Sequence, residues 1–64
     1  MFKKIQRVSD SKFLFSLENN VWVENIKEST TFNLNEFGYV KNILLETYQE
    51  TDLIIHTNYQ VKSV

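Results

Sequence analysis

The residue types that this sequence lacks already exclude several classes of protein. Its 64 residues include no cysteine, no proline, one glycine and one histidine. Without cysteine, a disulfide framework, thiol catalysis and cysteine-based zinc sites are excluded. His56 alone cannot assemble a histidine metal site, and none of the serines lies in the glycine-rich context of a nucleophile elbow. We therefore expect no cofactor, no metal and no enzymatic activity.

Length and composition predict a single small folded domain, residues 1–64. Hydrophobic residues make up 42% of the chain and charged residues 23%, which is typical of a globular domain. A chain of this size buries only about 60% of the surface that its unfolded form exposes. Because disulfides and metals are excluded, the core or oligomerisation must supply the stability.

The charge balance narrows the classes of partner. The formal net charge is −1, which argues against a nucleic-acid-binding domain, since these carry a basic excess. No apolar run approaches the length of a membrane span, and none of signal-peptide length follows the two lysines near the start. We expect a cytoplasmic protein with no membrane partner.

Three segments alternate apolar and polar residues with the period of a β-strand, and polar turn clusters separate them. The segments are residues 2–8, 13–17 and 21–24, and the turns are residues 9–11 and 18–20. Asparagine tolerates the left-handed backbone of tight hairpin turns. This arrangement predicts a three-stranded antiparallel meander.

A helix is predicted to begin at Leu34. Asn33 with Glu36 three residues later forms a capping box, and Phe32 with Phe37 has the spacing of a hydrophobic staple. The helix should end near residue 48 or 49. Its apolar side is expected to consist of Leu34, Phe37, Val40, Leu44, Leu45 and Tyr48.

A last alternating segment, residues 53–61, completes a β-β-β-α-β order. The expected fold class is α+β, with two layers: a mainly antiparallel sheet of three to four strands and one helix packed on one face. The last strand is predicted to lie parallel beside the first strand, in the order 3-2-1-4. Pairing with the third strand is the alternative.

The register of the second hairpin decides where Trp22, the only tryptophan, lies. If residues 18–20 form the turn, Leu17 lies opposite Val21 and these two face the helix. Trp22 then lies on the open face with Leu14 and Glu24, and forms an apolar patch there. Two alternatives remain open: Trp22 merely steadies the sheet through a cross-strand pair, or a register slip buries it under the helix.

A second candidate surface is acidic and lies on the outward side of the helix. One interpretation is an ordinary solvated helix face. The alternative is a negatively charged patch beside an aromatic residue, which could contact a basic surface on a partner. The partner-binding residues predicted from both surfaces are Trp22, Leu14, Glu24, Tyr39, Glu46 and Glu50.

The order of these motifs resembles a loose group of small phage-encoded proteins from Gram-positive bacteria. The resemblance rests on a lysine-aromatic-leucine strand, a turn, a tryptophan-valine pair, a polar link with a phenylalanine, and a capped helix followed by a strand. In this chain these are Lys12-Phe13-Leu14, Trp22-Val23, Phe32 and Asn33 with Glu36. The resemblance implies an accessory product of a phage or mobile element that binds a host component, and it assigns no site residues.

The function expected from the sequence is therefore a non-catalytic protein-interaction module, of a phage or mobile element, that inhibits or redirects a host protein. One alternative is a small nucleic-acid-associated regulator that uses Lys3, Lys4 and Arg7. Another is a structural homo-oligomer paired through strand edges or through the Trp22 face.

Overall fold

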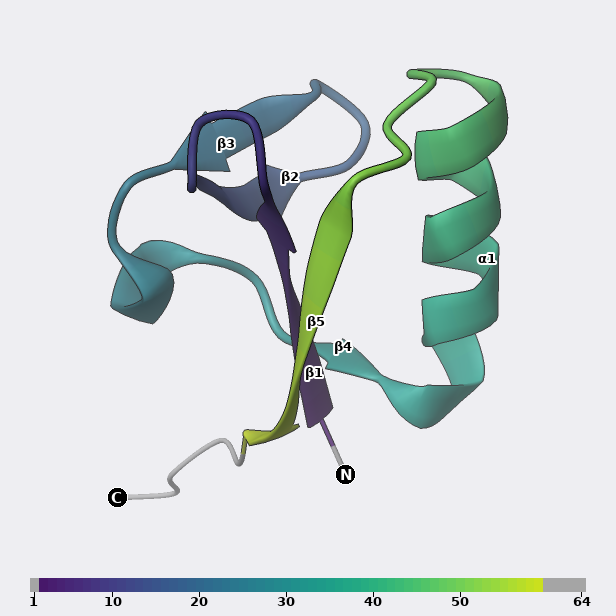
Figure 1. The fold of residues 1–64 in the computed structure, drawn as a ribbon. Helices are drawn as coiled ribbons and strands as arrows, with labels where there is room; N and C mark the ends of the chain where they lie inside the picture. Colours follow the sequence, from purple (N-terminus) through teal and green to yellow (C-terminus); the bar gives the residue numbers. More distant parts are fainter. Residues whose placement is uncertain (1, 60–64) are drawn as a thin grey trace.

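A computed structural model describes residues 2–59 of the chain and shows a five-stranded sheet with one α-helix (Figure 1). One 3-10 turn, η1, follows the third strand. In chain order the elements are β1 (Phe2–Arg7), β2 (Phe13–Ser16), β3 (Val21–Val23), η1 (Ile26–Glu28), β4 (Phe32–Asn33), α1 (Leu34–Glu46) and β5 (Leu53–Tyr59).

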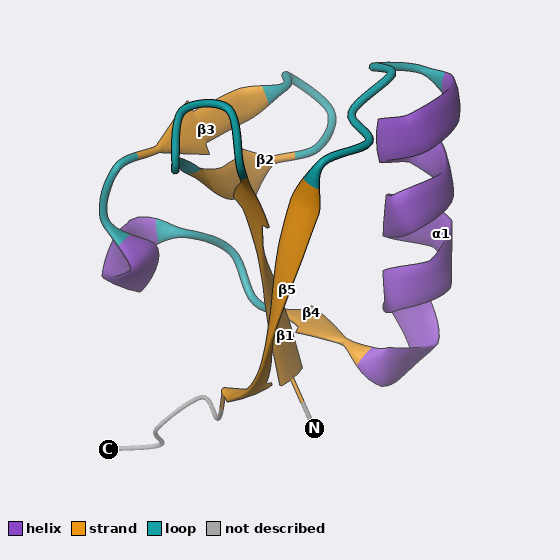
Figure 2. Ribbon diagram, viewed as in Figure 1, coloured by secondary structure: helices purple, strands orange, loops and turns teal. Residues whose placement is uncertain are grey.

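The sheet is built around β1, which pairs antiparallel with β2, β4 and β5. β5 covers one edge of β1 along its length, from Phe2 to Arg7. β4 and β2 share the other edge, because β4 pairs at Phe2 and Lys3 whereas β2 pairs at Gln6. The helix α1 lies on one side of β1 and β5, and η1 lies on the other (Figure 2). The predicted α+β class, with one helix on one face of an antiparallel sheet, is confirmed.

The last strand lies beside the first, as predicted, but its direction was predicted wrongly. β5 is antiparallel to β1, not parallel. The reason is β4, a two-residue strand formed by Phe32 and Asn33, which were predicted only as the staple residue and the cap of the helix. β4 already runs antiparallel to β1, so the helical crossover joins β4 to β5, and these two strands run the same way on either side of β1.

The predicted helix start is confirmed in detail. The backbone N–H of Glu36 donates to Asn33 Oδ1 over 2.9 Å, and the backbone N–H of Asn33 donates to Glu36 Oε1 over 3.0 Å. This reciprocal pair satisfies two of the N–H groups that the first helical turn leaves free. The helix ends at Glu46, two residues early, and Gln49 adopts a left-handed φ of 57° as the chain turns back toward β5.

The core lies between α1 and the sheet and consists of Ile5, Leu14, Phe32, Val40 and Leu44. Leu17, Trp22, Phe37, Tyr48, Leu53 and Ile55 pack against it. Two residues expected on the helix's apolar side, Leu34 and Leu45, are exposed.

The face assignment of the second hairpin was wrong. Leu14 pairs with Trp22 and is fully buried, whereas Val21, expected to face the helix, is 40% exposed. Val21 pairs with Ser16, not with Leu17, and the pairing shifts between Leu14 and Ser16. A bulge of this kind slips the register by one residue, and one residue exchanges the two faces of a strand.

Candidate functional site

The six residues predicted to bind a partner do not form one surface. Leu14 is fully buried and offers no contact area, so its assignment to the open face is wrong. Glu24 is exposed just after β3. Tyr39 and Glu46 are exposed on α1 at a spacing of seven residues, which places them on the same side of the helix. Trp22 and Glu50 belong to a different cluster.

That cluster is centred on the Arg7 side chain. Its guanidinium lies 4.4 Å from the centre of the Trp22 ring, in cation–π geometry, and Nη1 lies 3.3 Å from Glu50 Oε2. The Trp22 indole N–H donates to Asn20 Oδ1 over 2.8 Å. Arg7 therefore joins β3 to the loop between α1 and β5. Trp22 is half-buried beside the core, which is the register-slip alternative left open by the sequence.

Arg7 also holds the first turn through a two-pronged contact with Asp10. Nη2 lies 2.6 Å from Asp10 Oδ2, and Nε donates to Oδ1 over 3.1 Å. The hydrogen bond from Arg7 lowers the pKa of the Asp10 carboxyl to about 2, and the same bond raises the pKa of Arg7. The pair was not predicted from the sequence, although an aspartate in the predicted turn at residues 9–11 is a typical local hydrogen-bond acceptor.

Lys4 is a second cation with an internal role. Only 7% of the residue is exposed, and its ammonium donates to Ile26 O, Ser29 O and Ser29 Oγ over 2.9, 2.7 and 3.0 Å. Burial lowers the pKa of Lys4. The ammonium thus ties the 3-10 turn η1 to the face of the sheet opposite α1. Lys4 follows another lysine in the predicted strand, and nothing in the sequence around it indicated this role.

These contacts bear on the cations considered for nucleic-acid binding. Lys4 and Arg7 donate hydrogen bonds to other residues of the protein. Lys3 Nζ lies 5.2 Å from the centre of the Phe37 ring. Proteins bind the nucleic-acid backbone through lysine and arginine side chains that neutralise its phosphates. All three side chains instead contact neighbouring parts of the fold.

The sheet face opposite α1 carries a row of residues across four strands that is apolar except for Gln6. Ile54 pairs with Gln6, Gln6 with Phe13, and Phe13 with Val23, and directly opposite residues point to the same face. The Phe13 and His56 rings lie 5.7 Å apart on this face. Phe15, two residues after Phe13, is 49% exposed, and Ile54 is 46% exposed. We call Phe13, Phe15, Val23 and Ile54 the open-face patch.

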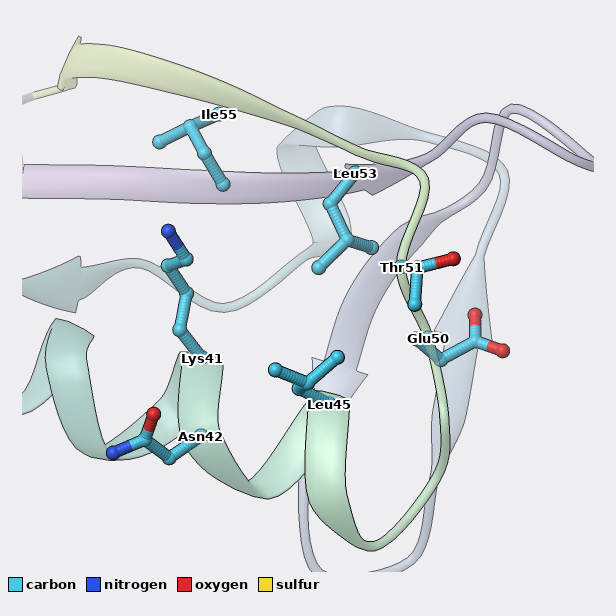
Figure 3. A pocket seen from close by; sticks show the side chains of 7 residues that line it. All are labelled: Lys41, Asn42, Leu45, Glu50, Thr51, Leu53 and Ile55. Carbon is cyan, nitrogen blue, oxygen red and sulfur yellow. The ribbon is translucent and has the colours of Figure 1, made fainter.

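A groove lies on the other side of the sheet, between α1 and β5. It has a volume of about 230 Å³. Leu45 projects from the helix below Leu53, and Lys41 projects below Ile55, so the groove has apolar walls with a cation toward one end (Figure 3). Asn42, Glu50 and Thr51 complete its lining.

Among residues 2–59, no helix has the length and apolar character that crossing a membrane requires. The same residues hold no cluster of three or more histidine, aspartate or glutamate side chains able to bind a metal ion. Comparisons of the chain with protein-family models, with curated proteins and with solved structures found no match.

Proposed function

We propose that this chain is a non-catalytic protein-interaction module that binds a protein partner through the open-face patch. The observation that supports it is the row from Ile54 to Val23, which leaves apolar surface on the face that α1 does not cover. Apolar side chains exposed singly are ordinary, but a contiguous group with an aromatic member is typical of a contact site. Phe15 is the most accessible aromatic member of the group.

The resemblance to small phage proteins directs the choice of partner. We propose that the partner is a protein of the host cell, met in its cytoplasm, and that binding inhibits or redirects it. The nucleic-acid alternative is less well supported, because Lys4 and Arg7 already donate to Ser29, Asp10 and Glu50. The acidic and aromatic side of α1, with Tyr39 and Glu46, is the second surface to test.

The experiment is affinity capture from host lysate with three matched variants. Phe15→Ser removes the exposed aromatic of the open-face patch, Tyr39→Ser removes that of the helix, and Leu34→Ser is the control at an exposed apolar site outside both. We expect one protein to be retained by wild type, Tyr39→Ser and Leu34→Ser and lost by Phe15→Ser. Circular dichroism must show that all three variants keep the fold.

The pattern of binding among the variants identifies which surface contacts the partner, as well as whether a protein partner exists. Loss of the partner by Tyr39→Ser alone would move the contact to the helix and refute the open-face assignment. Nucleic acid in the wild-type eluate, released by salt, would support the regulator alternative instead.

A further inference from the structure

The outer edge of β5 carries free backbone groups in a defined pattern. Within residues 2–59, β5 pairs with β1 alone. The N–H of Val8 donates to Asp52 O over 2.9 Å, one step beyond the Arg7–Leu53 pair. Since hydrogen-bonded and non-bonded pairs alternate in an antiparallel ladder, Ile54 and His56 direct their N–H and C=O groups to β1. The N–H and C=O groups of the alternate residues Leu53 and Ile55 therefore point to the outer edge. Beyond His56 the pairing with β1 shifts by one residue, so this alternation applies to β5 only as far as His56.

This edge carries few of the usual protections against pairing with another chain. Natural edge strands are short, are bulged, or carry lysine, proline or a covering loop. The one irregularity of β5 is the shift in its pairing with β1 beyond His56. β5 has seven residues, Leu-Ile-Ile-His-Thr-Asn-Tyr, without a proline, a glycine or a formally charged residue. The opposite edge of the sheet, β3, has only three residues and is protected by its brevity. Since no like charges oppose each other, a second β5 can approach the first without electrostatic repulsion.

The helix flank beside this edge has a matching pattern. Lys41 and Leu45 line the groove against β5, and the spacing of an α-helix places Leu34 and Gly38 on the same flank. Leu34 is 62% exposed and Leu45 is 52% exposed. A Cβ added to Gly38 would meet nothing within 4 Å, so contacts among the described residues do not require a glycine there.

The four flank residues are self-complementary about a two-fold axis. In an antiparallel arrangement centred between Gly38 and Lys41, Leu34 of one copy faces Leu45 of the other, and Gly38 faces the long side chain of Lys41. That centre lies about 2 Å from Lys41 along the helix. Lys41 lies level with Ile55 (Figure 3), and a strand rises about 3.4 Å per residue, so the same axis crosses β5 close to His56.

We infer that two copies of this chain associate by antiparallel pairing of their β5 strands around a two-fold axis at His56. The axis is perpendicular to the sheet, so both helices lie on the same face of one continuous sheet. His56 faces its own counterpart in a non-hydrogen-bonded pair. Ile55 of each copy lies opposite Thr57 of the other, so the outward N–H and C=O groups of Ile55 find their partners on the second chain.

The first test measures mass against concentration with variants of Thr57, an exposed residue on the free edge. By sedimentation, the wild type should shift from 7.6 kDa to twice that mass as its concentration rises from about 1 µM to 1 mM. Thr57→Val keeps the strand uncharged and should keep the dimer. Thr57→Lys charges the edge and should lose it. A wild type that stays monomeric throughout, or a dimer that Thr57→Lys leaves intact, overturns the inference.

The second test locates the axis and uses the absence of cysteine. Non-hydrogen-bonded partners have Cα atoms about 4.5 Å apart, within the range that a disulfide spans. Oxidised His56→Cys should therefore form a covalent dimer, whereas Val21→Cys on the β3 edge should remain monomeric. Cross-linking of Val21→Cys with none of His56→Cys would place the contact at β3 and overturn the β5 pairing. Both tests leave the four residues of the open-face patch unchanged and use no host partner, so failure here leaves the proposed function intact.

Discussion

Replacing Lys4 by methionine tests whether a buried ammonium holds the 3-10 turn η1 on the sheet. Methionine preserves most of the length of the lysine stem, so the substitution removes the charge without leaving a large cavity. It deletes the three hydrogen bonds to Ile26 O, Ser29 O and Ser29 Oγ. A hydrogen bond to a charged donor contributes about 1.5–3 kcal/mol, and a buried acceptor left without a donor costs about 1–3 kcal/mol.

Two features of the structure make the expected loss of stability smaller than the sum of these contributions. Ile26 O keeps two other donors, the backbone N–H of Ser29 at 3.2 Å and its hydroxyl at 2.6 Å, so the cost falls mainly on the Ser29 carbonyl. Methionine also avoids the desolvation that lowers the pKa of Lys4. We therefore expect Lys4→Met to lower the free energy of unfolding by about 2 kcal/mol, which corresponds to a Tm lower by about 8–16 °C for a domain of this size.

The assay is urea unfolding followed by the fluorescence of Trp22, which packs against the core. With an m-value of about 1 kcal/mol/M, the midpoint should fall by about 2 M. Lys27→Met is the matched control, because Lys27 lies in η1 itself but is exposed. If Lys4→Met and Lys27→Met unfold at the same midpoint as the wild type, the ammonium does not stabilise η1 and the reasoning is wrong.

Three further predictions concern the helix and the first turn. Asn33→Ala should cost about 1 kcal/mol in urea unfolding through loss of the capping box, and an unchanged midpoint would contradict that role. Gly38→Ala should raise the monomer's stability by about 1 kcal/mol, measured at low concentration, since the added Cβ meets nothing within 4 Å. The pKa of Asp10 is lowered from 3.8 to about 2, so its contribution to stability is complete above pH 4 and is lost as the pH falls toward 2. Asp10→Asn should flatten the acid unfolding curve in that window, and an identical curve would count against the Arg7 contact.

The elements set by short-range chemistry could be predicted from the sequence. The capping box at Asn33 and Glu36 depends on residues three apart, and the structure has it as expected. The α+β class followed from apolar periodicities of two and of about 3.6 residues, which local patterning alone specifies. Asn20 adopts the left-handed φ of 53° that its residue type favours at a hairpin turn.

Features that depend on one residue of register were decided only by the tertiary structure. The bulge between Leu14 and Ser16 exchanged the faces of β2 and β3, and so buried Leu14 and moved Trp22 beside the core. A bulge has no reliable sequence signature, because its position depends on which face of the strand packs into the assembled core. The direction of β5 likewise followed from β4, whose two residues form a strand only because β1 offers them an edge. The internal roles of Lys4 and Arg7 join residues up to 43 positions apart, and such contacts arise only once the chain has folded.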